Sequence, residues 1–308
     1  DAVVAELDSK IEIINQLQET VEANVSDLTW TMTGGEVTIT DCDTSASGTL
    51  VIPDTIEGNP VTSIASGTFS GCSSLTSIAI PDSVTTIGQN AFLGCSSLIS
   101  VTIPDSVTTI IQSAFFNCSS LTSVTIGNSV TSIPVNAFRG CSSLTSVTIP
   151  NGVTSIERAA FEDCKSLTSI TIPDSVTSIG RNAFSGCSNL TNITIPDGVT
   201  SIEDNAFGYC TSLTNITIPD SVTNIGRGAF RGCSALTTIE VAAGNVNYTE
   251  VNGVLFNTEM TLLHTYLAAK TGANYVIPDS VNSIGDYAFF ECSKLTSIEI
   301  PSGVTSIG

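Results

Sequence analysis

Residues 137–150 read AFRGCSSLTSVTIP, and this stretch decides the fold because the chain repeats it. Twenty-three residues earlier the sequence is AFFNCSSLTSVTIG, and twenty-three residues later it is AFEDCKSLTSITIP. A cysteine beside two serines and an arginine resembles a nucleophilic site. Recurrence at a fixed period instead indicates a structural repeat that stacks on its neighbours.

Two rows of residues keep this period of 23, and we predict that both rows form a core ladder. The phenylalanine row consists of Phe69, Phe92, Phe115, Phe138, Phe161, Phe184, Phe207 and Phe230. The cysteine row consists of Cys72, Cys95, Cys118, Cys141, Cys164, Cys187, Cys210 and Cys233.

Within one repeat, the stretch LTSVTI is rich in β-branched residues and ends at a proline, which is typical of a strand. Leu144, Val147 and Ile149 are its expected inward positions. The following stretch, with Val153 and Ile156, predicts an irregular or short helical return that also points apolar groups inward. Each repeat therefore supplies one strand and one return.

A single repeat cannot fold alone, because about six large apolar side chains do not offset the entropy lost on ordering its backbone. Stacked copies share their apolar faces and pair strands at a spacing of ~4.8 Å. We therefore predict an α/β repeat solenoid of about ten or eleven rungs, roughly 50 Å long, with a parallel β-sheet on one side.

The pattern L-x-x-I-x-I-P-x-x-V-x-x-I-x-x-x-A-F-x-x-C, which extends over Gly48–Gly308, resembles that of the BspA-like leucine-rich-repeat surface proteins. This resemblance implies a curved arc with the parallel sheet on its concave face and short helical or irregular returns. It also implies an extracellular or cell-surface location, in a host-associated bacterium. Adhesion through a host extracellular matrix or surface protein is a further implication.

The repeat pattern divides the chain into five parts. These are an amphipathic helix in 1–28, capping strands and a first rung in 29–71, regular repeats in 72–240, an irregular rung in 241–276 and terminal repeats in 277–308. The irregular rung holds GVLFN and TLLHTY on either side of the turn-like TEM, a pattern that predicts a β-hairpin. The final copy stops before its A-F-x-x-C, so we expect the natural chain to continue past Gly308.

Apolar residues of the first segment fall on heptad positions, which favours an amphipathic helix. The helix would shield the first rung or lead in from an anchor. A short coiled coil that pairs two chains is the alternative, although Gln18 interrupts the heptads. We expect a monomer, with a coiled-coil dimer as the alternative.

Charge and composition exclude several partners. The chain has 29 acidic and 9 basic residues, a formal net charge of -20, so it repels nucleic acid and anionic lipid. No apolar run approaches the ~20 residues that a membrane-spanning helix needs, which predicts no membrane insertion. The sequence starts at Asp1 and not at a methionine, as a processed or excised chain would.

The sequence predicts neither an enzyme nor a cofactor or metal protein. His264 is the single histidine, and no nucleophile-elbow or phosphate-loop motif is present. The cysteine row lacks the close C-x-x-C spacing of zinc sites, so we interpret it as buried free thiols, while Cys42 stays undetermined. A row of turn acids favours solvated turns over a metal ladder, and it contains Asp82, Asp105, Asp174, Asp197 and Asp220.

Two groups of residues are candidates for partner binding. The first is an outward threonine row on the strands, comprising Thr125, Thr148, Thr171, Thr194 and Thr217, with Thr102 at its start. It could match a repetitive ligand such as a glycan or ice, or it could reflect only that threonine suits exposed strands. The second is the aromatic set of the irregular rung, namely Tyr248, Phe256, His264, Tyr266 and Tyr275.

The return positions also carry five arginines that either form a modest basic patch or lie on a solvated face: Arg139, Arg158, Arg181, Arg227 and Arg231. The sequence as a whole favours a non-catalytic, secreted or surface-displayed protein that binds a protein or a glycan. The alternative is a structural spacer that projects another domain.

Overall fold

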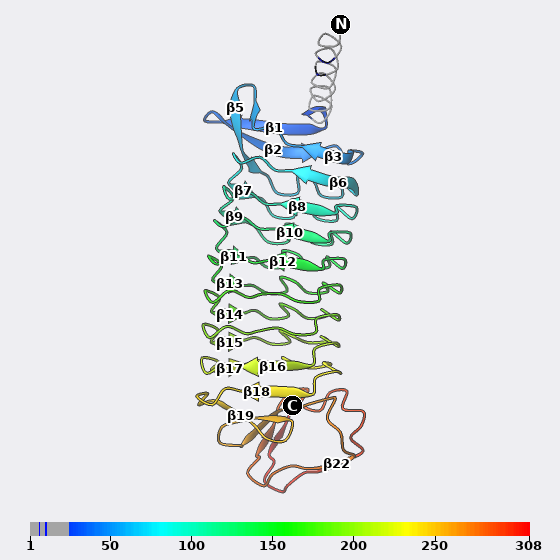
Figure 1. Ribbon diagram of the computed structural model, residues 1–308, viewed down its shortest axis with the longest axis vertical. Coiled ribbons are helices and arrows are strands. Elements are labelled where there is room, and N and C mark those ends of the chain that lie inside the picture. The colour runs from blue at the N-terminus through cyan, green and yellow to red at the C-terminus, as the bar shows by residue number, and fades with distance from the viewer. Residues whose placement is uncertain (1–5, 7–9, 11–24) are drawn as a thin grey trace.

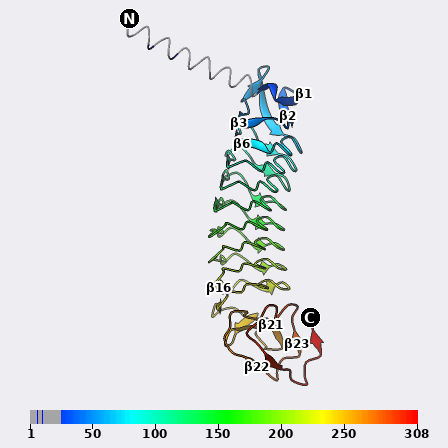
Figure 2. The same cartoon turned by 90° about the vertical axis from the view of Figure 1, so that its right-hand side faces the viewer.

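The computed structural model describes Glu6, Lys10 and residues 25–308. The helix expected for residues 1–28, and the coiled-coil dimer that it would support, lie almost wholly outside the described residues. From residue 27 onward the chain forms a parallel β-solenoid of about 12 turns. Figures 1 and 2 show the rungs stacked as a column, with β1 at one end and the residues after β18 at the other.

Each regular rung has three sides, and the first side is the strand that the sequence indicates. We call this layer the threonine sheet, and in it each strand pairs in parallel with its neighbours at a step of one repeat. Its strands are β3 (Ser47–Val51), β6 (Ser74–Ala79), β8 (Ser100–Thr102), β10 (Ser123–Thr125) and β12 (Ser146–Thr148). Single bridges at Thr171 and Thr194 continue it toward a further pair, β16 (Asn215–Ile218) and β18 (Thr238–Val241).

The second side is another parallel ladder, which we call the isoleucine sheet. Its strands are β5 (Asn59–Ile64), β7 (Thr86–Ile87), β9 (Thr109–Ile110), β11 (Ser132–Ile133), β13 (Ser155–Ile156), β14 (Ser178–Ile179), β15 (Ser201–Ile202) and β17 (Asn224–Ile225). The ladder is interrupted between β9 and β11. At this step Pro134 takes the place of residues such as Gly88 and Gly180, whose N–H groups donate to the isoleucine of the preceding rung. Proline has no N–H to donate, so the ladder breaks there.

At the N-terminal end, β1 (Leu28–Thr33) pairs antiparallel with β2 (Glu36–Cys42), and β2 pairs in parallel with β5. The short β4 (Thr55–Ile56) pairs antiparallel with β5. Cys42, at the end of β2, is buried and free, and its thiol donates to the Asp43 carbonyl that also accepts from Cys72.

The third side is a run of turns, for example residues 135–140, which we call the turn side. Alternate N–H groups bond locally and across rungs: Arg139 N donates to Asn136 O at 3.3 Å, whereas Phe138 N donates to Ala160 O of the next rung at 2.9 Å. Asn136 has a φ of 56°, a left-handed conformation that interrupts any helix.

The predicted α/β class with helical returns is therefore wrong, because residues 27–308 contain no helix. Val153 and Ile156 are three residues apart, a spacing that one helical turn and one corner of a β-solenoid share. In the structure Ile156 belongs to β13 and both side chains are fully buried. The layer interpreted as a return is thus a second sheet followed by turns.

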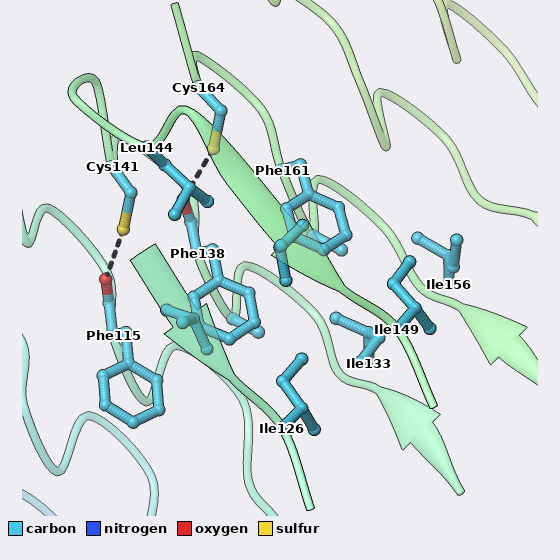
Figure 3. Packing of buried hydrophobic residues seen from close by; sticks show 14 of the residues in the cluster. Phe115, Ile126, Ile133, Phe138, Cys141, Leu144, Ile149, Ile156, Phe161 and Cys164 are labelled. Carbon is cyan, nitrogen blue, oxygen red and sulfur yellow. Dashed lines mark hydrogen bonds between the residues drawn. The ribbon is translucent and has the colours of Figure 1, made fainter. Parts of the chain in front are cut away.

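The phenylalanine and cysteine rows lie in the core, which Figure 3 shows from close by. Rings of the phenylalanine row stack with centroids 4.9–5.9 Å apart, from Phe69 to Phe230. From Cys95 to Cys233, each thiol of the row bonds to the carbonyl of the phenylalanine 26 residues earlier, as Cys164 Sγ does to Phe138 O at 3.2 Å. This carbonyl also accepts from the Cys141 N–H at 3.1 Å, so the small thiol adds a second donor from the next rung.

After β18 the stack changes register. β19 (Tyr248–Glu250), β20 (Val254–Asn257) and β21 (Leu262–Tyr266) form an antiparallel meander, and then β21 pairs in parallel with β23 (Ser283–Ile284) and β23 with β25 (Ser306–Ile307). The sequence indicated only the β20–β21 hairpin. A separate pair, β22 (Asn274–Val276) and β24 (Ser297–Glu299), continues the other side. The core is divided accordingly into two clusters.

Replacement of Phe138 by alanine should lower the free energy of unfolding by about 3–5 kcal/mol, because the cavity would lie between the rings of Phe115 and Phe161. Urea unfolding followed by circular dichroism measures the change. The matched control is Thr148→Ala, since this exposed side chain should contribute less than about 0.5 kcal/mol. Equal stability of the Phe138→Ala variant and the wild type would contradict the stacked core.

Native protein should protect nearly all its thiols from a thiol reagent. Nine of the cysteines are buried and only Cys292 is partly exposed. Burial raises the pKa of the Cys292 thiol to about 11, so the reactive thiolate is scarce even at this partly exposed site. We expect slow labelling of Cys292 alone in native buffer and of all ten cysteines in denaturant, counted by mass spectrometry. Rapid native labelling of most cysteines would contradict their burial.

Candidate partner-binding surface

The threonine row lies on the outer face of the threonine sheet. Thr125, Thr148 and Thr171 are exposed and directly adjacent across rungs. The row ends beside Glu240, which accepts a hydrogen bond from Thr217. A second exposed column of threonines bonds from rung to rung, as Thr145 Oγ1 does to Thr122 O at 3.0 Å. The face is therefore flat, polar and nearly uniform.

The aromatic residues of the irregular rung do not gather at the surface. Phe256 is 1% exposed, Tyr266 is 3% exposed and His264 is 8% exposed. Tyr248 and Tyr275 are half-buried. The sequence predicted these five side chains as partner-binding candidates because of their density. In the structure they fill and close the core where the register changes.

Tyr248 and His264 terminate the isoleucine sheet. The N–H of Ile225, on the last strand β17, donates to the Tyr248 hydroxyl at 2.8 Å. The carbonyl of Ile225 lies 3.0 Å from His264 Nε2. Because a carbonyl can only accept, Nε2 carries the proton, and Nδ1 then accepts from the Thr265 hydroxyl at 2.8 Å. Two side chains thus satisfy backbone groups that another rung would otherwise pair.

Tyr266 takes over the place of the phenylalanine row. Its N–H donates to Ala288 O at 2.8 Å, and Cys292 Sγ lies 3.6 Å from its carbonyl, which repeats the pattern of the regular rungs. The Tyr266 ring packs on Phe289 at 5.4 Å and on Tyr275 at 5.0 Å between centroids. The ladder therefore restarts at Tyr266, in the second core cluster.

The turn side differs from the two sheets because its residues change from rung to rung. The position after each row phenylalanine holds Ser70, Leu93, Phe116, Arg139, Glu162, Ser185, Gly208 and Arg231. Every arginine of the chain lies on this side. Arg139 pairs with Glu162 at 2.9 Å, and Arg227 pairs with Asp286 at 3.1 Å. Two of the five arginines are therefore neutralised by acids of the same side.

An arginine–aromatic cluster lies at the C-terminal end of the turn side and consists of Tyr209, Arg231, Tyr287 and Phe290. The guanidinium carbon of Arg231 is 4.9 Å from the Tyr209 ring centroid, 4.7 Å from that of Tyr287 and 5.8 Å from that of Phe290. Phe290 meets both tyrosine rings edge to face, at 5.9 and 6.1 Å. Tyr287 is 47% exposed, so the cluster reaches the surface.

Two glycines admit the tyrosine rings of the cluster. A Cβ atom on Gly232 would lie 2.6 Å from Tyr209 Cδ1, and one on Gly228 would lie 2.9 Å from Tyr287 Cδ2. Both glycines have positive φ, 68° and 58°. The rings therefore pack on bare backbone, and any larger residue would push them away.

The described residues contain no candidate metal cluster. Among them, no group of three or more His, Cys, Asp or Glu side chains is placed to hold a metal ion. Turn acids bond to backbone instead: Asp105 accepts from Asn128 N at 2.7 Å, and Asp220 accepts from Gly244 N at 3.0 Å. The part of the chain that the structure describes also has no helix long and apolar enough to cross a membrane.

A family model described as "BspA type Leucine rich repeat region (6 copies)" matches residues 49–168, 154–273 and 264–308. This chain belongs to the BspA-type leucine-rich-repeat family. Members of the family are typically displayed at the bacterial surface or secreted, and they are generally non-catalytic.

Solved structures of bacterial leucine-rich-repeat proteins are similar to this family member. One from T. pallidum is 32% identical over 68% of this chain and 88% of that protein, with a TM-score of 0.56. A leucine-rich cell surface protein from Faecalibacterium prausnitzii is 31% identical over 89% of this chain and 93% of that protein, with a TM-score of 0.52. A leucine-rich-repeat protein from Eubacterium ventriosum is 26% identical over 92% of this chain and 60% of that protein, with a TM-score of 0.56. No curated protein matches the chain.

The arginine–aromatic cluster was missed because its members come from different repeats and are separated by up to 81 residues, from Tyr209 to Phe290. A signal was nevertheless present. At the position of Tyr209 most regular copies carry Gly, Asn or Asp, for example Gly186 and Gly232. An aromatic residue at a turn position that normally holds a small or polar residue could have drawn attention.

Stability should depend on pH through His264. Burial lowers the pKa of this imidazole below its usual ~6.5 in an unfolded chain. The folded state then binds fewer protons, so the stability contributed by neutral His264 is present above the unfolded pKa. It decreases as the pH falls below about 6.5 and is lost once the pH is below the folded pKa.

We therefore expect the wild type to lose more stability than His264→Gln between pH 7.5 and pH 5. Glutamine can donate to Ile225 O but does not titrate, so the variant is a matched control for the other groups that titrate. Urea unfolding at each pH measures the difference between the two proteins. Parallel pH profiles would show that His264 does not contribute in this way.

Proposed function

We propose that this family member is a non-catalytic binding protein, secreted or displayed on a bacterial cell, that attaches to a host protein. The observation that carries the proposal is the arginine–aromatic cluster on the turn side. Tyrosine and arginine are enriched in the residues that dominate binding energy at protein interfaces. A rigid scaffold that presents such residues at one irregular place is well suited to selective recognition.

Location at the cell surface is supported by the family and by the similar protein from Faecalibacterium prausnitzii, which is described as a cell surface protein. The strongly negative net charge of -20 disfavours nucleic acid as the partner. A host matrix or surface protein fits the proposal better than a glycan, because the threonine sheet, which could match a repetitive glycan, carries no aromatic ring in its exposed row.

The competing hypothesis of a spacer assigns no binding role to any surface. The register change after β18 brings Tyr287 and Phe290 against Arg231. The binding proposal gives this cluster a role, whereas the spacer hypothesis does not. A spacer needs only continuous rungs. The two hypotheses therefore give opposite expectations for a binding assay.

The test measures binding of the chain to immobilised host matrix proteins and glycans by surface plasmon resonance. Saturable binding to a protein is expected, and a Tyr287→Ala, Phe290→Ala double variant should weaken it by about thirtyfold, as loss of an interface hot spot does. Thr148→Lys with Thr171→Lys, on the threonine sheet, is the matched control and should bind normally. Thermal unfolding verifies that each variant is folded.

Other outcomes distinguish the remaining hypotheses. Loss of binding only in the threonine-sheet variant would move the site to the uniform face. Absence of binding to any member of the panel would favour the spacer.

A further inference from the structure

Arg231 has no ionic partner within the described residues, although two other arginines of the turn side do. Arg139 and Arg227 pair with Glu162 and Asp286, whereas the guanidinium of Arg231 lies over the rings of aromatic residues. Its Nε is buried and meets no hydrogen-bond acceptor in the same part of the chain. The nearby carboxylate of Asp286 is held by Arg227.

Stacking between rings fixes the guanidinium without neutralising it. Each ring attracts the cation, and none removes its charge. A partly buried cation held in one orientation loses little conformational entropy when it binds, so it is preorganised for an incoming anion. The planar fork of N–H groups matches a carboxylate in particular, which it can bind through two parallel hydrogen bonds.

We propose that Arg231 receives an aspartate or glutamate side chain of a protein partner, with Tyr287 and Phe290 forming the apolar rim of the site. The inference rests on the proposed function and names the chemistry that the partner supplies. The rings of Tyr209 and Tyr287 pack on glycine backbone and on Arg231, which leaves less ring surface for a sugar to stack on. This arrangement disfavours sugar stacking and favours a peptide segment over an acidic glycan.

The charge of the whole chain restricts the partner further. At a net charge of -20 the chain repels strongly acidic proteins at long range. The carboxylate that Arg231 binds is therefore expected to be a single acid within a neutral or basic surface, beside an apolar residue that covers Tyr287 and Phe290. A run of several acids would be repelled by the acids of the turn side, such as Asp204 and Glu291.

The experiment selects binders from a random dodecapeptide phage library on the complete chain and measures the affinity of synthetic copies by isothermal titration calorimetry. We expect the enriched peptides to share one Asp or Glu beside an apolar residue. Arg231→Gln and Arg231→Lys should each weaken binding by about tenfold or more, since lysine keeps the charge but not the planar fork. Arg181→Gln removes an exposed arginine of the same side and should leave the affinity unchanged.

A change in the peptide alone makes the test independent of variant folding. Replacement of the shared Asp by Asn, or of Glu by Gln, should weaken binding to the unaltered protein by about tenfold or more, as the Arg231 variants do. The original and the replaced peptide should bind the Arg231→Gln protein with equal affinity. Peptides that bind the wild type and Arg231→Gln equally would overturn this inference and leave the proposed function intact. Failure to select any peptide would count against both.

A parallel arm applies the same proteins to an array of sialylated and uronic-acid glycans. Arg231-dependent binding to these glycans, with no Arg231-dependent peptide, would show that the carboxylate comes from a sugar and would overturn the proposal of a protein partner.

Discussion

Hydrogen bonding between successive rungs is the constraint on which the rest of this structure depends. A 23-residue rung of two short strands and a set of turns leaves many backbone groups without a partner in the same rung. The isoleucine sheet, the threonine sheet and alternate turn residues pair these groups with the neighbouring rung. The cysteine thiol adds a donor for the phenylalanine carbonyl of the preceding rung. The fixed repeat length, the phenylalanine of each rung and the small cysteine side chain, which can donate a hydrogen bond, are all consistent with this pairing.

The same constraint explains the two places where the isoleucine sheet is interrupted. Pro134 lacks the N–H that would bond to the preceding rung, and the ladder stops for one step while the rings of Phe115 and Phe138 remain stacked at 5.4 Å. At β17 no regular rung follows, and Tyr248 and His264 supply the acceptor and donor that Ile225 requires. The buried N–H and C=O groups at the edge of the last strand need hydrogen-bond partners. This need accounts for Tyr248 and His264 in the irregular rung.

The period of 23 was sufficient to predict stacking, the buried rows and the threonine strand, because these depend on residues that recur in every copy. The second sheet could not be separated from a helical return, since Val153 and Ile156 fit both. The role of the irregular rung was also hidden: aromatic density at Tyr248 and Tyr266 is equally compatible with a surface site and with a closed core. Only the positions of Ile225 and Ala288, which are remote in sequence, distinguish the two.

The arginine–aromatic cluster depends on the register change. In a regular column the neighbours of Arg231 would be the residues one repeat away, Gly208 and Val254, and Val254 instead lies fully buried in β20. The meander removes Val254 from the turn side, so the turn of Asp286 and Tyr287 lies against the rung of Arg231. An uninterrupted array of identical rungs could not assemble four different side chains at one point. Irregularity in this solenoid is therefore the physical origin of the arginine–aromatic cluster, and selectivity for a partner can arise there without any change in the rungs that support it.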